Sequence, residues 1–178
     1  GNGNFSYNTA VGVHSMQNMS SGTYNAALGY QASHYNTSGS NNTSLGGFAL
    51  KSNTTGSGSV AIGYEALETA TTEGSLTAIG YQAAKANTTG TGTVALGYQA
   101  LTSNTTGEAN TASGFEALKS NTTGGYNTAS GYQSLYSNTT GANNTSLGYQ
   151  SLYQSTTGGD NTASGYQSLY SNTTGANN

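Results

Sequence analysis

Apolar and polar residues follow a short pattern that returns every 17 residues along almost the whole chain. The pattern is centred on one glycine, called here the repeat glycine, which occurs ten times without an insertion between copies. Its positions are Gly12, Gly29, Gly46, Gly63, Gly80, Gly97, Gly114, Gly131, Gly148 and Gly165. A fixed period of this kind is the sequence signature of a solenoid, in which each copy stacks on the next.

The residues on both sides of the repeat glycine alternate with a period of two. Before it stand mostly a Thr or Val, then always an Ala or Ser, then a Leu, Ile, Val or Ser. Alternation predicts a short strand with Thr/Val and Leu/Ile on one face and the small residues on the other. After it come an aromatic residue, a Gln or Glu, a small residue and, in seven copies, a Leu, which predicts a second short strand with Leu turned inward. The remaining SNTTGAN segment is typical of turns, because Asn tolerates left-handed backbone and Gly adopts positive φ.

These elements predict an all-β fold, a two-sided parallel β-solenoid, or β-roll, of ten 17-residue rungs over residues 8–178. Residues 1–7 match the repeat poorly and are expected to form a cap or junction. A helix is disfavoured because every copy contains at least two glycines, each of which costs about 1 kcal/mol in a helix interior. Only about four inward apolar side chains per rung are expected, which barely offsets the entropy of ordering a rung. The columns of small residues then have two interpretations: they face outward and let a second roll approach, or they face inward where the roll is thin.

Composition removes several classes of partner. Charged residues make up 5% of the chain, the net charge is −3, and the three basic residues are all lysine. We therefore expect neither nucleic acid nor an anionic lipid surface as a partner. There is no cysteine for a disulfide or a thiolate metal site, and no apolar run approaches the ~20 residues that cross a bilayer. We expect no cofactor and no membrane insertion.

The phrases SVAIGYEAL and TVALGYQAL resemble the SVAIG-type head repeats of trimeric autotransporter adhesins, and the NTTG turns resemble repeat arrays of phage-type tail fibre proteins. The resemblance covers about residues 8–178. It implies a left-handed parallel β-roll that associates as a homotrimer. The repeat differs in length, because the adhesin repeat is commonly near 14 residues.

Candidate chemistry is sparse. His14 and His34 stand in different columns without a nearby carboxylate, which predicts no metal site, and there is no GxSxG motif or spaced Ser/His/Asp set for nucleophilic catalysis. We expect no catalytic residue and no enzyme activity. The NTT turns create asparagine sequons at Asn53, Asn87, Asn104, Asn121, Asn138 and Asn172.

The most informative column lies five residues after the repeat glycine and is called here the variable column. Its members are Gln17, His34, Lys51, Glu68, Lys85, Thr102, Lys119, Tyr136, Tyr153 and Tyr170. Lys51, Glu68 and Lys85 are expected to form an exposed ladder of alternating charge. Tyr136, Tyr153 and Tyr170 predict a tyrosine ladder, which is the candidate surface for sugar stacking or protein contact. The alternative is that these rings only stack on one another and stiffen the rungs.

The sequence thus predicts a non-enzymatic structural or adhesive fibre segment, the rigid head or shaft of an extracellular, cell-surface or virion fibre that attaches to a cell-surface glycan or protein. The first alternative is a passive spacer with no ligand of its own. A remote alternative is an ice-binding protein, suggested by the paired threonines of the turns. Because the array ends inside a unit at Asn178, we also expect the chain to continue beyond it.

Overall fold

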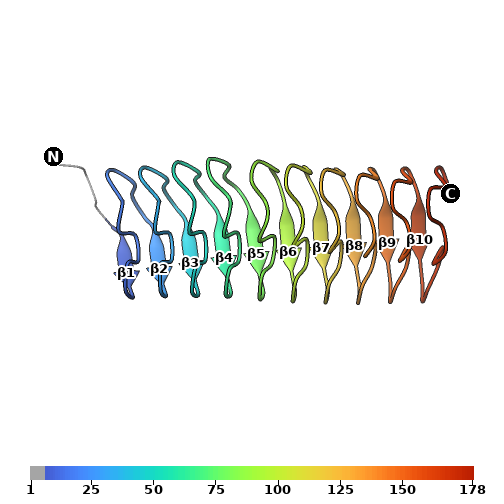
Figure 1. The fold of residues 1–178 in the computed structure, drawn as a ribbon, viewed down its shortest axis with the longest axis horizontal. Helices are drawn as coiled ribbons and strands as arrows, with labels where there is room; N and C mark the ends of the chain where they lie inside the picture. Colours follow the sequence, from blue (N-terminus) through green and yellow to red (C-terminus); the bar gives the residue numbers. More distant parts are fainter. Residues whose placement is uncertain (1–6) are drawn as a thin grey trace.

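The computed structural model describes residues 7–178 as one stack of coils that contains strands and turns and, within that range, no helix. Each coil contributes one three-residue strand, and all strands are parallel in a single sheet whose order follows the sequence (Figure 1). The strands are β1 (Thr9–Val11), β2 (Ala26–Leu28), β3 (Thr43–Leu45), β4 (Val60–Ile62), β5 (Thr77–Ile79), β6 (Val94–Leu96), β7 (Thr111–Ser113), β8 (Thr128–Ser130), β9 (Thr145–Leu147) and β10 (Thr162–Ser164). Every strand residue of β1 to β9 pairs with the residue 17 positions later, as Ala61 does with Ala78. The predicted parallel β-solenoid with 17-residue rungs is confirmed.

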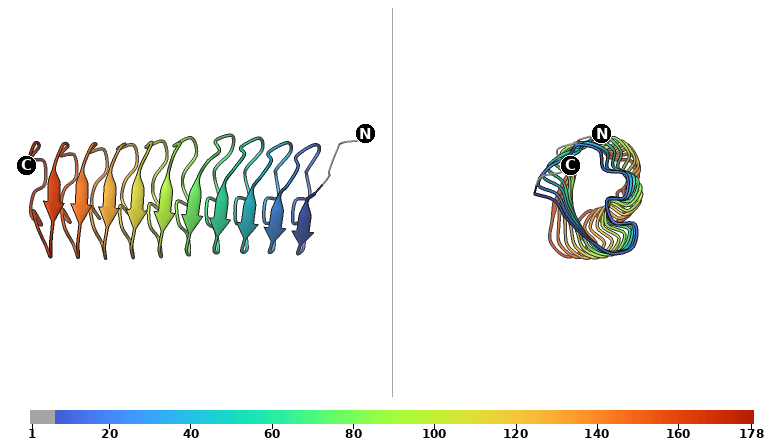
Figure 2. Two further views of the ribbon diagram at one scale, coloured as in Figure 1. Left: turned by 180° about the vertical axis from the view of Figure 1, so that it is seen from behind. Right: turned by 90° about the vertical axis from the view of Figure 1, so that its left-hand side faces the viewer.

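The coils follow one another closely in outline. Seen end-on, their traces nearly superimpose and rotate slightly from the N-terminal to the C-terminal coil (Figure 2). The predicted junction at residues 1–7 lies outside the described residues except for Tyr7, whose ring stacks on that of Tyr24 with centroids 4.8 Å apart.

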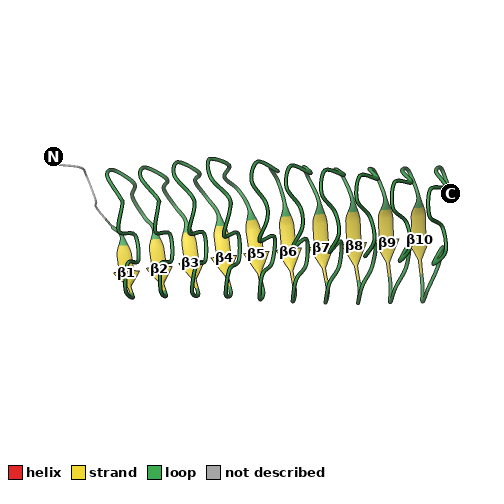
Figure 3. Ribbon diagram, viewed as in Figure 1, coloured by secondary structure: helices red, strands yellow, loops and turns green. Residues whose placement is uncertain are grey.

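Each coil has one strand among the described residues, not the two that we predicted (Figure 3). The segment after the repeat glycine is a series of tight turns, in which the amide of Ser134 donates to the carbonyl of Gly131. The φ angles of Gln133 and Leu135 are positive, 50° and 54°. An extended strand needs negative φ at every residue, so this segment cannot be a strand. It still joins the coils, because the amide of Leu135 donates to the carbonyl of Ser151 in the next coil at 2.9 Å.

The interior is narrower than we predicted. Leu118, Leu135 and Leu152 are fully buried and occupy the same place in successive coils, as expected. The small residues are buried as well, and the hydroxyl of Ser134 donates across the interior to the hydroxyl of Ser146 at 2.7 Å. The outward interpretation of the small columns is therefore wrong. A 17-residue coil leaves little room beside the leucine column, so the Ala and Ser residues that face this column are small.

The strand face that points outward holds the larger apolar residues. From β2 to β10 the last strand residue is half-buried or exposed, as Leu28, Ile79 and Leu96 are, whereas the small residue before it is buried. The alternation along the strand was predicted correctly, but its apolar face is the outer one. The roll therefore presents aliphatic side chains to its surroundings.

Buried asparagines take the place of a larger apolar core. The first asparagine ladder lies seven residues after the repeat glycine, in the NTT turns. Its fully buried members are Asn36, Asn53, Asn87, Asn104, Asn121 and Asn138. Nδ2 of Asn121 donates to Oδ1 of Asn104 at 2.8 Å and to the carbonyl of Gly124 at 2.9 Å. Because the side chain satisfies both a neighbouring amide and a turn carbonyl, it links successive coils through the interior.

A second asparagine ladder lies four residues before the repeat glycine. The amide nitrogen and Nδ2 of Asn144 both donate to Oδ1 of Asn127, at 3.0 and 3.1 Å, and Nδ2 also donates to the carbonyl of Gly158. This ladder is interrupted before β4, β5 and β6, where Ser59, Leu76 and Thr93 replace asparagine. Polar ladders on both sides of the leucine column supply cohesion that the apolar count alone does not.

The turn glycines are required for a reason other than the one predicted. Gly107 shows no positive φ, unlike the repeat glycines, whose φ angles lie between 124° and 144°. A Cβ added to Gly107 would collide with the carbonyl oxygen of Gly124 and would lie 2.5 Å from Oδ1 of Asn104. Close approach of backbone to backbone therefore selects glycine in the turn.

Candidate functional site

The predicted tyrosine ladder forms in the structure. The rings of Tyr136, Tyr153 and Tyr170 are stacked, with centroids 5.1 Å apart at both steps and interplanar angles of 14° and 7°. Lys119 lies over the free face of Tyr136, 5.7 Å from its centroid. Stacking covers the ring faces between coils, so the ladder presents ring edges and hydroxyl groups to solvent. A sugar needs an open ring face to stack on, whereas a hydrogen-bonding partner needs only the hydroxyl row.

Tyr153, in the middle of this ladder, keeps its proton at neutral pH. Desolvation raises the pKa of Tyr153 above its ordinary value, and the neighbouring Tyr136 and Tyr170 raise it further. The Tyr153 hydroxyl can therefore donate a hydrogen bond.

A longer stack follows the repeat glycine and is called here the aromatic ladder. Its members are Tyr64, Tyr81, Tyr98, Phe115, Tyr132, Tyr149 and Tyr166, with centroids 4.9–5.7 Å apart. Gly47 interrupts the column in the sequence, but the ring of Phe48 lies 5.2 Å from Tyr30 and 5.7 Å from Tyr64, edge to face with both. The next residue in the chain thus fills the gap, which the column-by-column reading of the sequence missed.

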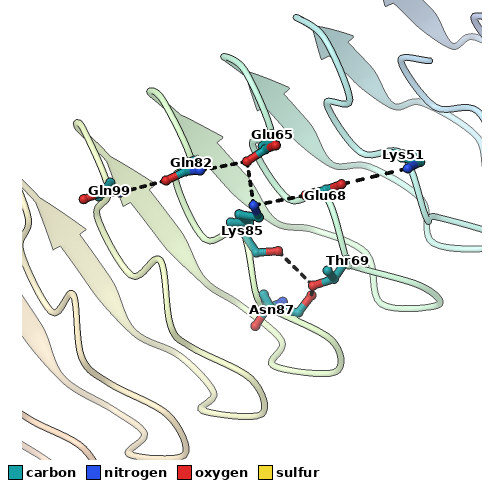
Figure 4. A network of polar contacts seen from close by, with 8 residues as sticks. All are labelled: Lys51, Glu65, Glu68, Thr69, Gln82, Lys85, Asn87 and Gln99. Atoms are coloured by element: carbon teal, nitrogen blue, oxygen red, sulfur yellow. Dashed lines mark hydrogen bonds and ion pairs between the residues drawn. The ribbon is translucent and has the colours of Figure 1, made fainter. Parts of the chain in front are cut away.

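The predicted alternation of charge is confirmed, although the three side chains are half-buried and not exposed, and the ladder belongs to a larger network (Figure 4). Glu68 lies between Lys51 at 4.0 Å and Lys85 at 3.5 Å. The closest partner of Lys85 is Glu65, at 2.6 Å, which the sequence analysis did not single out. Glu65 stands in a different column from Lys85, two residues after its repeat glycine, so alignment of the variable column alone could not reveal the pair.

Side-chain amides extend this network along the rod. Nε2 of Gln82 donates to Glu65 at 2.8 Å, and Nε2 of Gln99 donates to Oε1 of Gln82 at 2.7 Å (Figure 4). A second amide ladder has the same design and comprises Glu116, Gln133, Gln150 and Gln167. Each ladder begins at a glutamate paired with a lysine, so every amide donates in the same direction along the rod.

The two glutamates that start the ladders are held ionised. Desolvation alone would raise the pKa of Glu65, but hydrogen bonds from Lys85 and Gln82 outweigh it, and the pKa lies below its ordinary value. Glu116 follows the same pattern with Lys119 and Gln133, and its pKa is also lowered. The hydrogen bond to Glu65 in turn raises the pKa of Lys85.

Sites for other chemistry do not emerge from residues 7–178. The rings of His14 and His34 lie closer than their separate columns suggested, with centroids 6.0 Å apart, and Nδ1 of His34 lies 3.0 Å from the carbonyl oxygen of His14. No group of three or more His, Cys, Asp or Glu residues in the described range could hold a metal ion, and no pocket opens in the same part of the chain. Within these residues there is also no helix with the length and apolarity to cross a membrane.

Most of the turn asparagines are buried, and many of the turn threonines make hydrogen bonds within the rod. Asn53, Asn104 and the equivalent sequon residues are fully buried except at the last coil, so the folded rod does not present them for glycan attachment. In six of the Thr–Thr pairs the first hydroxyl bonds the next coil, as Thr105 does to the carbonyl of Thr122 at 2.9 Å. Before the last coil only the second threonine of a pair, such as Thr106, is exposed, so the turns present one row of threonines and not paired threonines.

Comparisons with protein-family models, curated proteins and solved structures found no match to this chain. The residues and their geometry are therefore the basis of any functional conclusion.

Proposed function

We propose that this chain is a non-enzymatic structural or adhesive segment, the rigid head or shaft of an extracellular or virion fibre that associates as a homotrimer. The observation behind the proposal is the unbroken 17-residue register of the ten parallel strands. Nine steps of about 4.8 Å separate the first strand from the last by roughly 43 Å. The length of such a rod scales with the number of copies, which suits a part that holds other parts at a distance.

The side chains support a stiff rod. Asparagine, amide and aromatic ladders each join neighbouring coils, and several bonds of each kind repeat at the same place in successive coils. Bending the rod would separate groups that are hydrogen-bonded or stacked, so every ladder opposes it. This cohesion along the rod axis supports a mechanical function. The side chains that a partner could contact lie in repeated surface rows.

The adhesive form of the proposal assigns contact with a cell-surface glycan or protein to the hydroxyl row of Tyr136, Tyr153 and Tyr170. The spacer form assigns the row to stiffening alone. One observation favours the spacer form: the ring faces are covered by neighbouring rings at 5.1 Å.

Replacing all three tyrosines with threonine separates these two forms. Thr102 already occupies the variable column with its coil intact, so the variant is expected to fold. Binding to a glycan array and to cultured cells is measured for the wild type, the variant and a control in which exposed Thr106, Thr123 and Thr140 are changed to serine. Loss of binding in the tyrosine variant alone supports adhesion through the ladder. Unchanged binding, with a circular dichroism spectrum that shows an intact rod, leaves the spacer, and clear thermal hysteresis in ice would contradict both.

A further inference from the structure

One turn of the rod lacks the residues that the other turns share. It joins β4 to β5, comprises residues 70–76 and is called here the fourth turn, each turn being numbered by the strand that it follows. Ala70 and Leu76 occupy its two asparagine-ladder positions, whereas every other turn between two described strands keeps an asparagine in at least one of them. Oδ1 of Asn53 in the third turn and Oγ1 of Thr93 in the fifth are buried without a hydrogen-bond partner among the described residues. Both interior ladders are therefore interrupted at the fourth turn.

The threonine bonds between neighbouring turns are also interrupted there. In the third turn the amide of Thr54 donates to the carbonyl of Thr71 at 2.6 Å, and in the fifth turn the amide of Thr88 donates to that of Thr105 at 2.9 Å. The hydroxyls of Thr54 and Thr88 donate to the same two carbonyls. Within residues 7–178, neither the amide nor the hydroxyl of Thr71 donates a hydrogen bond. The carbonyl of Thr88 therefore receives no bond from the fourth turn.

A second bond between the fourth and fifth turns is missing further along. The amide of Ser75 donates back to the carbonyl of Ser57 in the third turn at 2.9 Å. The equivalent bond, from the amide of Gly92 back to the carbonyl of Gly74, does not form among the described residues. The fourth turn is thus hydrogen-bonded to the turn before it and not to the turn after it.

A glutamate explains this separation. Glu73 stands where every other described turn has its turn glycine. The close approach that selects glycine in the turns is impossible for Glu73, because its Cβ would meet the carbonyl of Gly90 in the fifth turn. Gly74 makes the close approach on the opposite side, where an added Cβ would collide with the carbonyl oxygen of Ser57. The fourth turn consequently lies toward the third, and the upper loops of the fourth and fifth coils stand further apart than their strands do (Figure 1).

The rest of the two coils stays joined on both sides of the fourth turn. Before the turn, the hydroxyl of Thr69 donates to the carbonyls of Lys85 and Asn87, at 2.8 and 3.1 Å (Figure 4). After the turn, β4 and β5 are paired in register, with Val60 opposite Thr77. A segment with few bonds between two well-bonded segments opens locally without unfolding the whole protein. Opening is therefore confined to residues 70–76.

We propose that the fourth turn is the place where an endopeptidase that accepts glutamate cuts the folded rod, between Glu73 and Gly74. Water adds across this peptide bond: its oxygen enters the new Glu73 carboxylate, and both of its hydrogens end on the new ammonium group of Gly74. Cleavage of a folded chain follows the population of the locally opened state. Each hydrogen bond changes an equilibrium constant by about 2- to 12-fold, so the bonds missing at Thr71 and Gly92 make opening here at least about 10-fold more frequent than at a complete turn. This cleavage site goes beyond the proposed fibre function and does not depend on it.

Limited digestion of the full chain with a glutamate-specific endopeptidase tests the inference. Glu108 is the internal control, because it lies in the complete sixth turn and is more exposed than Glu73. Fragment masses over time give the initial rate of cleavage after each glutamate, and each rate is divided by that of a short peptide with the same sequence. The corrected rate after Glu73 is expected to be at least about 10-fold that after Glu108. Equal rates, faster cleavage after Glu108, or no cleavage after Glu73 in the folded chain would overturn the inference.

A variant with a completed fourth turn tests the cause of the opening. Ala70→Asn, Glu73→Gly, Gly74→Glu and Leu76→Asn together introduce the residues that the sixth turn has at the same places, and they keep one glutamate in the turn. With an unchanged circular dichroism spectrum, this variant is expected to be cut after position 74 at least about 10-fold more slowly than the wild type is cut after Glu73, with the same peptide correction. A folded variant that is cut as fast as the wild type would overturn the role of the missing bonds. The comparison of Glu73 with Glu108 in the wild type stands whether or not the variant folds.

Discussion

Replacing one asparagine of the first ladder tests whether buried amides hold the coils together. Asn104 is fully buried, and its Nδ2 donates to Oδ1 of Asn87 at 2.7 Å and to the carbonyl of Gly107 at 3.0 Å. Its own Oδ1 accepts from Asn121 at 2.8 Å. Asn104→Ala removes three hydrogen bonds, each worth about 0.5–1.5 kcal/mol net, and leaves buried groups unpaired at about 1–3 kcal/mol. We expect the free energy of unfolding to fall by roughly 2–5 kcal/mol.

The chain provides an internal control for this substitution. Ala70 replaces the asparagine in the coil after Asn53, and Oδ1 of Asn53 is a buried oxygen without a hydrogen-bond partner among the described residues. Asn53→Ala therefore loses only the bonds of Nδ2, to Asn36 at 3.3 Å and Gly56 at 3.0 Å, and removes an unpaired oxygen.

Urea unfolding at one fixed protein concentration measures both variants against the wild type. Asn104→Ala is expected to cost at least about 1 kcal/mol more than Asn53→Ala, or roughly 2–4 °C in melting temperature for a chain of this size. Equal costs, or a cost below about 1 kcal/mol for Asn104→Ala, would refute the claim that the ladder acts through its bonds between coils.

Three further substitutions test the packing and the charges. Gly107→Ala is expected to destabilise the rod strongly because its Cβ meets the Gly124 carbonyl. Gly92→Ala is expected to cost only about 1–2 kcal/mol, because its Cβ lies 3.7 Å from the nearest atom and the strain comes from the φ of 62° alone. Similar melting temperatures for the two variants would contradict this. The pKa of Glu65 is lowered by folding, so its contribution is complete above the unfolded pKa of about 4.3 and is lost as pH falls through the folded pKa. Glu65→Gln is therefore expected to lower the free energy of unfolding by about 0.2–1 kcal/mol at pH 7. It is also expected to make the loss of stability below about pH 4 smaller than in the wild type. An unchanged pH profile of the urea midpoint would count against the ion pair. Thr105→Val, which loses the bond to Thr122, is expected to cost about 1 kcal/mol, and its exposed neighbour in Thr106→Val less than about 0.5 kcal/mol; the opposite order in calorimetry would show that the assignment of the two threonines is wrong.

The period of the sequence was enough to predict the parallel solenoid, because a strict repeat without insertions places equivalent residues on top of one another. It was not enough to say which face of each strand is the inner one. Hydrophobicity alone favours Leu96 over Ala95 as the buried residue, yet Ala95 is buried and Leu96 exposed. The size of the coil decides this, since Leu101 already fills the interior. The width of the coil interior depends on all 17 residues of the coil and not on any local pattern.

The prediction of a second strand in each coil was wrong for a different reason. Leu and Gln after the repeat glycine alternate as strand residues do, but both adopt positive φ, as in Gln99 and Leu101 at 51° and 52°. Neither residue type signals that conformation in a sequence. The asparagine ladders could have been anticipated, because identical asparagines stacked at strand spacing pair their amides as they do in cross-β structures. The stacking of Tyr136, Tyr153 and Tyr170 was predictable from their shared column. That neighbouring rings cover each other's faces depends on the angles between the ring planes, which the sequence does not give.

Distances between paired spin labels test the central claim that each 17-residue copy adds one step to a straight stack. Thr55, Thr140 and Thr174 occupy the same exposed turn position, five coils and then two further coils apart. With about 4.8 Å per coil, labels at Thr55 and Thr140 are expected to lie roughly 24 Å apart, and labels at Thr55 and Thr174 roughly 34 Å apart, apart from the length of the label. Two narrow distributions that differ by about 10 Å would agree with the stacked coils. Broad distributions, or a second distance no longer than the first, would contradict them.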